Sequence, residues 1–214
     1  MNAVVRFMIL SDTVWTGALG LLGPIFSLFV VDFIEGGSPV VAGMAAAVYL
    51  ISKSLFQMPF AHLVDRIAGE RDDYWIMLCG SFAAALMPLF YLAVGTSGQL
   101  YAVQFAYGLV MAATFPSFIA IYVRHIDRDR EAVTWGVYAT VVDLSAALGA
   151  SFGGIIAGSF GYRRLVVLLV VLSLAGVAAL LPVRRHVIGR VRENGASAAE
   201  AVVLSPPGIG DSRR

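Results

Sequence analysis

Cysteine, lysine and histidine are nearly absent from this sequence of 214 residues. Cys79 is its one cysteine, Lys53 its one lysine, and the chain has three histidines. A single cysteine cannot form an intramolecular disulfide, and no group of cysteines and histidines has the spacing of a metal cage. The P-loop pattern Gly-x-x-x-x-Gly-Lys-Ser/Thr is also missing. The sequence therefore predicts no metal site and no other cofactor, and an ATP-driven reaction of the P-loop type would need another subunit.

Charged residues are scarce as well, and this scarcity decides the class of protein. Only 14% of the residues are charged, 59% are apolar, and the mean hydropathy is +0.82. A water-soluble fold could not bury that much apolar surface. Six stretches reach the length of about 20 residues that crosses a hydrocarbon core about 30 Å thick. We predict spans near residues 7–34, 40–62, 74–95, 100–123, 132–158 and 163–182.

The predicted fold is an all-α integral membrane protein, a bundle of six transmembrane helices formed by residues 1–185. The first span begins near Arg6 and is too long for a cleavable signal peptide, so we expect it to be retained. Beyond Pro182 the composition changes to arginine and then to Gly, Ala, Ser and Pro. We therefore predict that residues 186–214 form a C-terminal tail, disordered over 193–214.

The arginines are distributed unevenly between the two ends of the predicted spans. Lysine and arginine near span ends are retained on the cytoplasmic side of a membrane. With the N-terminus inside, ten arginines among residues 1–192 fall on the inner side and only Arg163 and Arg164 fall outside. We predict that both termini are cytoplasmic in a multi-pass protein of a bacterial plasma membrane.

Two charged residues lie deep inside predicted spans. A charge at the bilayer centre costs about 2.5–3.5 kcal/mol, so it normally faces a bundle interior and finds a partner there. Lys53 is nine residues from the inner end of the second span and Asp143 eleven from that of the fifth, at depths of about 14 Å and 17 Å. They can form an ion pair, functional or purely structural, if these spans are neighbours. Tyr49 and Gln57 extend a polar stripe from Lys53 at four-residue intervals.

Other residues of the spans are assigned lesser or structural roles. Asp12 and Asp32 fall near the two ends of the first span, where solvation is cheaper, so we expect them to matter less. Gly149, Gly153 and Ala157 follow one another at four-residue spacing in the fifth span. Small residues at this spacing let two helix backbones approach closely, which predicts a helix-packing face.

The segment after the second span carries a resemblance to a known family. Residues 61–71 read Ala-His-Leu-Val-Asp-Arg-Ile-Ala-Gly-Glu-Arg. This segment resembles the signature Gly-x-Leu-Ala-Asp-Arg-x-Gly-Arg of the major facilitator superfamily, at the same inter-helix position. The match rests on Leu63, Asp65 and Arg66. It departs at Ala61, which replaces glycine, and at Gly69, which arrives one residue late.

Three further segments are similar to motifs of the same family. Gln104 stands where the family often has the arginine of Arg-x-x-x-Gly, with Gly108 in place, so roles tied to that arginine are not implied. Residues 149–154 are similar to the antiporter glycine motif without its proline. Residues 161–164 resemble the Gly-Trp-Arg turn before the sixth span.

The resemblance covers residues 1–185, which correspond to one half of a twelve-span transporter. It implies two inverted three-helix repeats, with spans 1, 2, 4 and 5 bordering a central cavity and spans 3 and 6 outside. It also implies transport of a small-molecule solute by alternating access. A homodimer, or a second six-span half, would restore the missing half. Met1 and the polar tail give no sign of a fragment, although truncation at the family's central loop would look the same.

The resemblance also implies roles for particular residues. The residues assigned to the substrate or ion pathway are Lys53, Asp143, Gln57, Gln104 and Tyr107. Asp65 and Arg66 would form a gating loop at the inner side. Its expected partners in the next inner loop are Arg124, Asp127 and Arg128, whose charges also fit ordinary cytoplasmic loops.

Two other functions compete with transport. Residues 149–153 spell Gly-x-Ser-x-Gly, but a serine nucleophile of that type needs a strand–turn–helix context and a nearby base. The motif lies within a helical apolar run and no histidine lies inside a predicted span, so we predict that the protein is not an enzyme. The remaining alternative to a transporter is a non-transporting membrane scaffold or assembly protein derived from a transporter half. Neither function involves nucleic acid.

Overall fold

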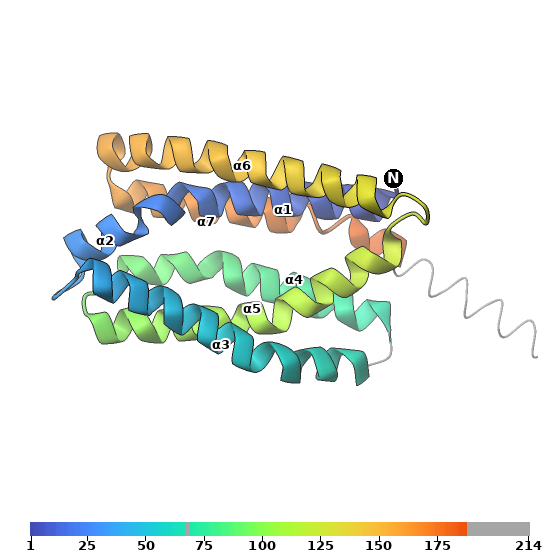
Figure 1. Ribbon diagram of the computed structural model, residues 1–214, viewed down its shortest axis with the longest axis horizontal. Helices are drawn as coiled ribbons and strands as arrows, with labels where there is room; N and C mark the ends of the chain where they lie inside the picture. The colour runs from blue at the N-terminus through green and yellow to red at the C-terminus, as the bar shows by residue number, and fades with distance from the viewer. Residues whose placement is uncertain (67–68, 188–214) are drawn as a thin grey trace, which may run out of the picture.

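Six membrane-length helical segments make up the part of the chain that the computed structural model describes, residues 1–66 and 69–187 (Figure 1). Their bounds are Ala3–Phe33, Pro39–Arg66, Glu70–Leu92, Ser97–His125, Glu131–Phe160 and Tyr162–Val187. The predicted all-α fold with six spans is confirmed. The predicted tail, apart from residues 186 and 187, lies outside the described residues.

Prolines divide two of the six segments. The first consists of α1 (Ala3–Leu22), the 3-10 turn η1 (Gly23–Ile25) and α2 (Phe26–Phe33), and Pro24 lies in η1. The third consists of α4 (Glu70–Leu86) followed by η2 (Met87–Leu92), and Pro88 lies at the start of η2. Proline has no backbone N–H to continue an α-helical ladder, which explains why the regular helix changes at these positions.

The other segments are α3 (Pro39–Arg66), α5 (Ser97–His125), α6 (Glu131–Phe160) and α7 (Tyr162–Ala178). A capping box starts α5, in which Thr96 Oγ1 accepts from the Gln99 N–H and Gln99 Oε1 accepts from the Thr96 N–H. Gly161 joins α6 to α7 with a φ of 81°, a left-handed conformation that favours glycine. We call the end of the bundle with these connections the turn end. The opposite end, which holds Met1, is the N-terminal end.

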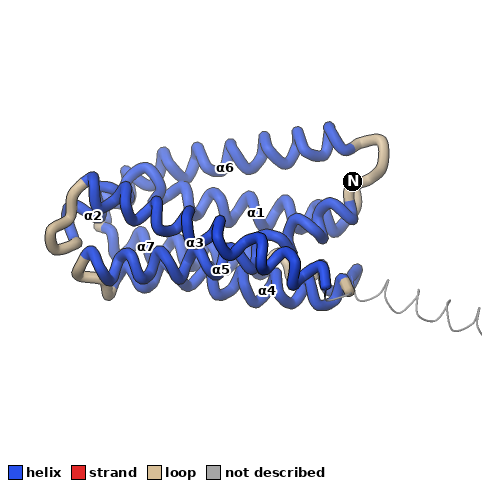
Figure 2. The backbone as a smooth tube through the Cα atoms, turned by 60° about the horizontal axis from the view of Figure 1, so that its bottom comes forward, coloured by secondary structure: helices blue, strands red, loops and turns tan. Residues whose placement is uncertain are grey.

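The helices pair in two groups of three. In one group α1 packs against α6 and α7, and in the other α5 packs against α3 and α4. Contacts of α4 with α7 and of α2 with α3, and fewer of α1 with α5, join the groups. Exchanging the first three spans with the last three maps the pairings of α1 onto those of α5 and the α4–α7 contact onto itself, as expected of two inverted three-helix repeats. The contact of α2 with α3 is not repeated in this way. Figure 2 shows the helices running side by side along the length of the bundle.

Small residues let the paired backbones approach closely. Gly149 and Gly153 of α6 lie against the backbone of α1 at Gly17, Gly20 and Leu21. In the other group Gly108 of α5 lies against α3, where Ser52 Oγ donates to the Phe105 carbonyl oxygen at 3.2 Å. Both crossings depend on the absence of a bulky side chain, as is usual for helices packed in lipid.

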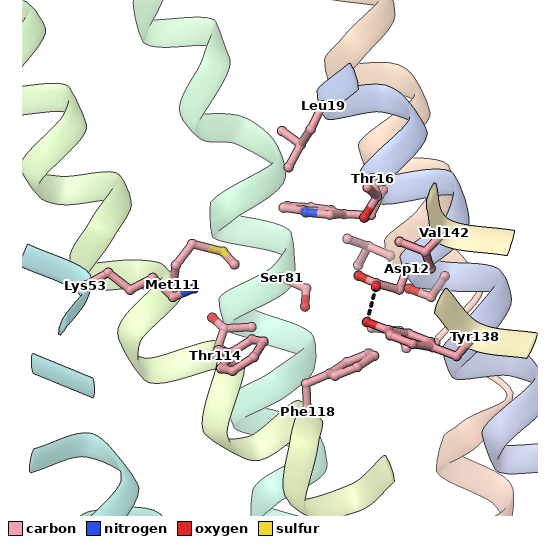
Figure 3. A pocket seen from close by; sticks show the side chains of 15 residues that line it. Asp12, Thr16, Leu19, Lys53, Ser81, Met111, Thr114, Phe118, Tyr138 and Val142 are labelled. Carbon is pink, nitrogen blue, oxygen red and sulfur yellow. Dashed lines mark hydrogen bonds between the residues drawn. The ribbon is translucent and has the colours of Figure 1, made fainter. Parts of the chain in front are cut away.

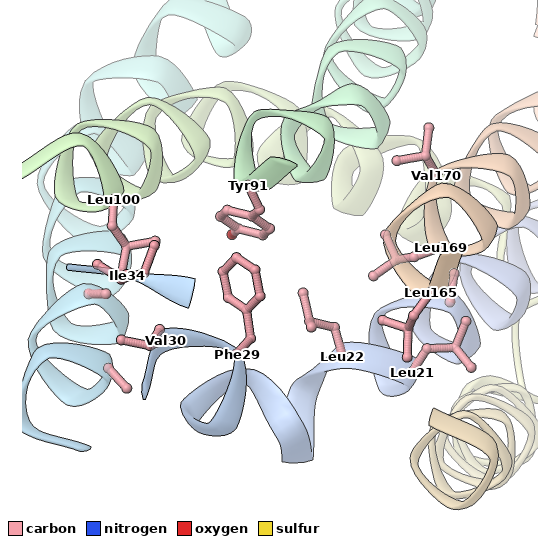
Figure 4. Packing of buried hydrophobic residues seen from close by; sticks show 13 residues of the cluster. Leu21, Leu22, Phe29, Val30, Ile34, Tyr91, Leu100, Leu165, Leu169 and Val170 are labelled. Atoms are coloured by element: carbon pink, nitrogen blue, oxygen red, sulfur yellow. The ribbon is translucent and has the colours of Figure 1, made fainter. Parts of the chain in front are cut away.

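Two apolar clusters fill the bundle, one toward each end. At the turn end, Phe29, Tyr91, Leu100 and Leu165 belong to a cluster that draws on both groups of helices (Figure 4). At the N-terminal end, Met8, Tyr74, Met77, Tyr122 and Leu180 belong to a second cluster. A cavity with several polar side chains lies between the two clusters.

Candidate functional site

A cavity of about 280 Å³ lies between the two groups of helices, and all six spans contribute to its lining (Figure 3). Its walls combine apolar side chains such as Trp15, Met111 and Phe118 with a small set of polar ones. The polar lining residues are Ser11, Asp12, Thr16, Lys53, Ser81, Thr114 and Tyr138. An apolar pocket with a few convergent polar groups is the usual form of a small-molecule site.

Asp12 is the acidic residue of this cavity. The Tyr138 hydroxyl donates a hydrogen bond of 2.6 Å to Asp12 Oδ2, which ties α6 to α1 across the cavity wall. The expectation that Asp12 lies near a span end is wrong. Because α1 begins at Ala3, Asp12 is nine residues into the helix, about 14 Å along its axis. Its carboxylate therefore lies well inside the bundle.

Lys53 is the basic residue of the same cavity and enters it from α3. Its Nζ lies 4.6 Å from the centroid of the Phe115 ring, a cation–π contact. In Figure 3, Lys53 and Asp12 approach from opposite sides, with Met111 and Ser81 between them. The cavity thus has one basic and one acidic side chain on separate walls.

The structure does not join Lys53 to Asp143 within one chain. Asp143 is exposed on α6 and is not among the residues that line this cavity. The α3 helix packs on α2 and α5, whereas α6 packs on α1 and α7. Within residues 1–66 and 69–187, no ion pair shorter than 4.0 Å connects the two residues. A similar depth along two helices says nothing about which helices are neighbours.

The other predicted pathway residues lie in separate hollows. Gln104 and Tyr107 line a second cavity of about 280 Å³ nearer the turn end, where the Tyr91 hydroxyl donates to Gln104 Oε1 at 3.4 Å. Leu19 borders both cavities, so they adjoin each other. Gln57 lines a third hollow, near the N-terminal end of the bundle. Of the five predicted pathway residues, only Lys53 lies in the cavity that contains Asp12.

The expected partners of the gating loop are engaged elsewhere. Arg124 forms an ion pair with Asp73 of α4, and Asp127 lies 3.0 Å from the amino group of Met1. Asp65 and Arg66 are exposed at the end of α3, and Arg128 is also exposed. In this conformation Arg124 and Asp127 therefore have other partners, and their pairing with Asp65 and Arg66 stays a prediction. The Asp73 side chain is only 2% exposed, so it offers Arg124 a partner shielded from water.

Several residues of the cavity were not predicted from the sequence. Ser81, Thr114 and Tyr138 lie in three different spans, and no local pattern connects them. Asp12 could have been found, because residues 3–33 form one apolar segment in which a charge near position 12 is deep. The Tyr138–Asp12 hydrogen bond joins residues 126 positions apart, which only the tertiary structure reveals.

The chain matches a known protein family. The family model of the Major Facilitator Superfamily matches residues 8–209. No curated protein matches the chain. The family match includes all six spans from the second turn of α1 onward, and it confirms the resemblance seen in the sequence motifs. This chain, an integral multi-pass membrane protein of six spans, therefore belongs to the major facilitator superfamily, a family of membrane transporters.

Proposed function

We propose that this protein is a secondary transporter that carries a small solute across the membrane by alternating access, acting as a homodimer of six-span chains. The observation that carries the proposal is the cavity between the two apolar clusters, with Asp12 and Lys53 on separate walls. A charged side chain deep in a membrane domain normally serves a substrate or ion pathway. Here two opposite charges share one such cavity.

The size of the cavity supports the homodimer. A pocket that encloses a small molecule usually measures about 300–1,000 Å³, and a cavity of about 280 Å³ lies just below this range. In twelve-span transporters two six-span halves meet around one site near the midplane. A second copy of this chain, related by a two-fold axis along the membrane normal, would enlarge the cavity and enclose the solute.

The contacts at the N-terminal end suggest how the cavity is gated. Arg124 and Asp73 connect α5 to α4, and Asp65 and Arg66 lie at the nearby end of α3. We propose that the rocking of the two chains is accompanied by an exchange of ion pairs. Asp65 and Arg66 would pair with the charged residues of segment 124–128 in one conformation and separate from them in the other. Such an exchange is a discrete two-state change, as alternating access requires.

Uptake by purified protein in proteoliposomes tests the transporter function. Labelled sugars, amino acids and organic acids are offered as a panel, and at least one is expected to accumulate above protein-free vesicles. Lys53→Ala should then lower uptake roughly tenfold or more, because loss of a charged contact costs about 1.5–3 kcal/mol. Leu55→Ala, on the exposed apolar side of the same helix, is the matched control and should transport normally.

Accumulation of no solute by folded, dimeric protein would instead favour the scaffold function. Equal uptake by Lys53→Ala and the control would remove Lys53 from the pathway. The oligomeric state of each variant is measured in parallel, so that loss of a dimer is not mistaken for loss of solute binding.

The orientation inferred from the arginines makes a separate prediction. Tags at both termini should report from the cytoplasm of a bacterial cell. In a Cys79→Ala background, Ser97→Cys at the turn end should react with a membrane-impermeant maleimide added from outside. Ser97 begins α5, and its hydroxyl hydrogen bonds the Glu35 carbonyl of the neighbouring turn, so this position lies at the bundle surface. Labelling of Ser97→Cys only in inverted vesicles would reverse the proposed topology.

A further inference from the structure

Asp143 has an unusual position for a charged residue. It is exposed on α6, twelve residues from the helix start at Glu131, or about 18 Å along the axis. At that depth an isolated chain would present the carboxylate to lipid, which membrane proteins avoid. No described residue forms an ion pair with it within 4.0 Å. A group from outside the chain is therefore expected to cover Asp143.

The exposed surface of α6 has two different sides. One side carries large apolar residues suited to lipid, namely Val133, Val137, Leu144, Leu148, Phe152 and Ile155. The other carries small or polar residues, all exposed, namely Gly136, Thr140, Asp143, Ala147, Gly154 and Gly158. A Cβ added at any of these three glycines would meet nothing within 4 Å. The small side thus has room for another helix to approach closely.

The α3 helix repeats this division. Its lipid-type side carries Val40, Met44, Ile51, Leu55 and Met58, all highly exposed. The adjoining side carries Gly43, Ala46, Leu50, Lys53, Gln57 and Ala61. This side borders α5, because Lys53 Nζ lies against the Phe115 ring of that helix. Lys53 is 13 residues from the end of α3 at Arg66, or about 20 Å, which matches the depth of Asp143 on α6.

Two-fold symmetry brings these two sides together. The helices succeed one another across the bundle in the order α3, α5, α1 and α6, since each neighbouring pair in this order is in contact. Figure 1 shows α3 and α6 at opposite edges. A two-fold axis along the membrane normal, passing beside α5 and α1, sets α3 of one copy opposite α6 of the other. The two helices then run antiparallel, and each contact occurs twice.

The facing sides match position by position at equal depth. Depth is counted in residues from Arg66 on α3 and from Glu131 on α6, which are the ends of these helices at the N-terminal end of the bundle. Residues with similar counts lie opposite one another in the dimer. The resulting pairs are Gly43 with Gly154, Leu50 with Ala147, Lys53 with Asp143, Gln57 with Thr140, and Ala61 with Gly136. They combine opposite charges, two hydrogen-bonding side chains and small residues facing small or apolar ones, which is what close membrane helices use.

We infer that α3 of each chain packs on α6 of a second copy, so that Lys53 pairs with the partner's Asp143 across the homodimer. This inference rests on the homodimer of the proposed function and specifies its contact. It explains why two residues of equal depth and opposite charge are not neighbours within one chain. Since Lys53 also lines the cavity, the partner subunit contributes a carboxylate beside the cavity wall.

Exchanging the charges between copies tests the inference. Lys53→Asp alone sets two carboxylates opposite each other in the dimer, and Asp143→Lys alone sets two ammonium groups there. Each variant should lose dimer roughly tenfold or more, since like charges across an interface disfavour association. Co-expression of the two variants with different tags restores both opposite-charge pairs, but only in the mixed dimer. The two tags should therefore co-purify from mild detergent.

The mixed dimer discriminates between the possible locations of the pair. If Lys53 and Asp143 paired within one chain, neither variant would be repaired by the other, and absence of co-purification would overturn the inference. Uptake is measured on the same sample. Uptake by the unsubstituted dimer is measured beside it, because the mixed dimer has its cavity charges exchanged. A mixed dimer that forms while the unsubstituted protein takes up no solute keeps the interface and counts against the transporter function, so the two failures are distinguishable.

Disulfide cross-linking covers the case in which the charge variants do not fold. In the Cys79→Ala background, one tagged copy carries Gln57→Cys and the other Thr140→Cys. Oxidation in membranes should join the two tags covalently. Leu55→Cys with Val141→Cys is the control at matched depth on the lipid-type sides, and it should give at least about fivefold less cross-link if small-residue sides form the contact. Equal yields for the two combinations would contradict the proposed interface.

Discussion

Replacing Arg124 by alanine is expected to destabilise the folded protein by about 2–3 kcal/mol. Arg124 pairs with Asp73, whose side chain is only 2% exposed and whose Oδ1 has no other protein partner within the described residues. Removing one member of a buried ion pair typically costs about 3–5 kcal/mol, because the remaining charge is left uncompensated. The expected loss is smaller than this here, because the Arg124 side chain is 43% exposed and solvent weakens the attraction.

The free energy of unfolding of the purified protein in detergent or bicelles measures this effect. Arg71→Ala removes an exposed arginine from the first turn of α4, close to Asp73 in sequence, and should change stability by less than about 0.5 kcal/mol. Asp73→Asn combined with Arg124→Ala should recover much of the loss, because the uncompensated charge is gone. An Arg124→Ala protein as stable as Arg71→Ala would show that the ion pair does not hold α4 to α5.

Replacing Gly153 by alanine is expected to destabilise the protein by about 1–3 kcal/mol, the usual cost of adding a carbon to a filled contact. A Cβ at this position would overlap the Leu21 carbonyl, and backbone cannot rotate away as a side chain can. The α1 and α6 helices must therefore move apart. Gly153→Leu should prevent their contact and leave little monodisperse protein on size-exclusion chromatography.

Gly98→Ala is the control for this crossing. Gly98 lies in the first turn of α5, away from the contact of α1 with α6, and a Cβ there would meet nothing within 4 Å. Alanine should be neutral or stabilise by up to about 1 kcal/mol, because glycine is the more flexible residue in a helix. Opposite signs for the two variants, measured by unfolding in bicelles, are the expected result. Similar effects at both positions would mean that the helices do not cross closely at Gly153.

Hydropathy alone did not locate the start of the third span. The third span was predicted to begin near residue 74, but α4 begins at Glu70. Glu70, Asp72 and Asp73 lower the local hydropathy and yet suit the first turn of a helix, where acidic side chains interact with free backbone N–H groups. The helix therefore extends past the apolar run on which the prediction rested.

The candidate site was predictable only where a residue could be judged by itself. Lys53 was identified because a lysine inside an apolar run is costly wherever the helix packs, and it lines the cavity. Gln104 and Tyr107 were assigned to the same pathway by resemblance, but they line the adjoining cavity. Asp12 was undervalued because its distance from the span end depends on where α1 starts, at Ala3.

Span number, helical character and the small-residue face of α6 were determined by the sequence alone. Each is a local property, because about 20 apolar residues cross a bilayer as a helix whatever surrounds them. Which helices are neighbours was decided only by the tertiary structure. The Tyr138–Asp12 hydrogen bond and the Arg124–Asp73 ion pair depend on the rotation of each helix about its axis. That rotation is set by side-chain packing between segments far apart in the chain, and no periodicity within one segment can encode it.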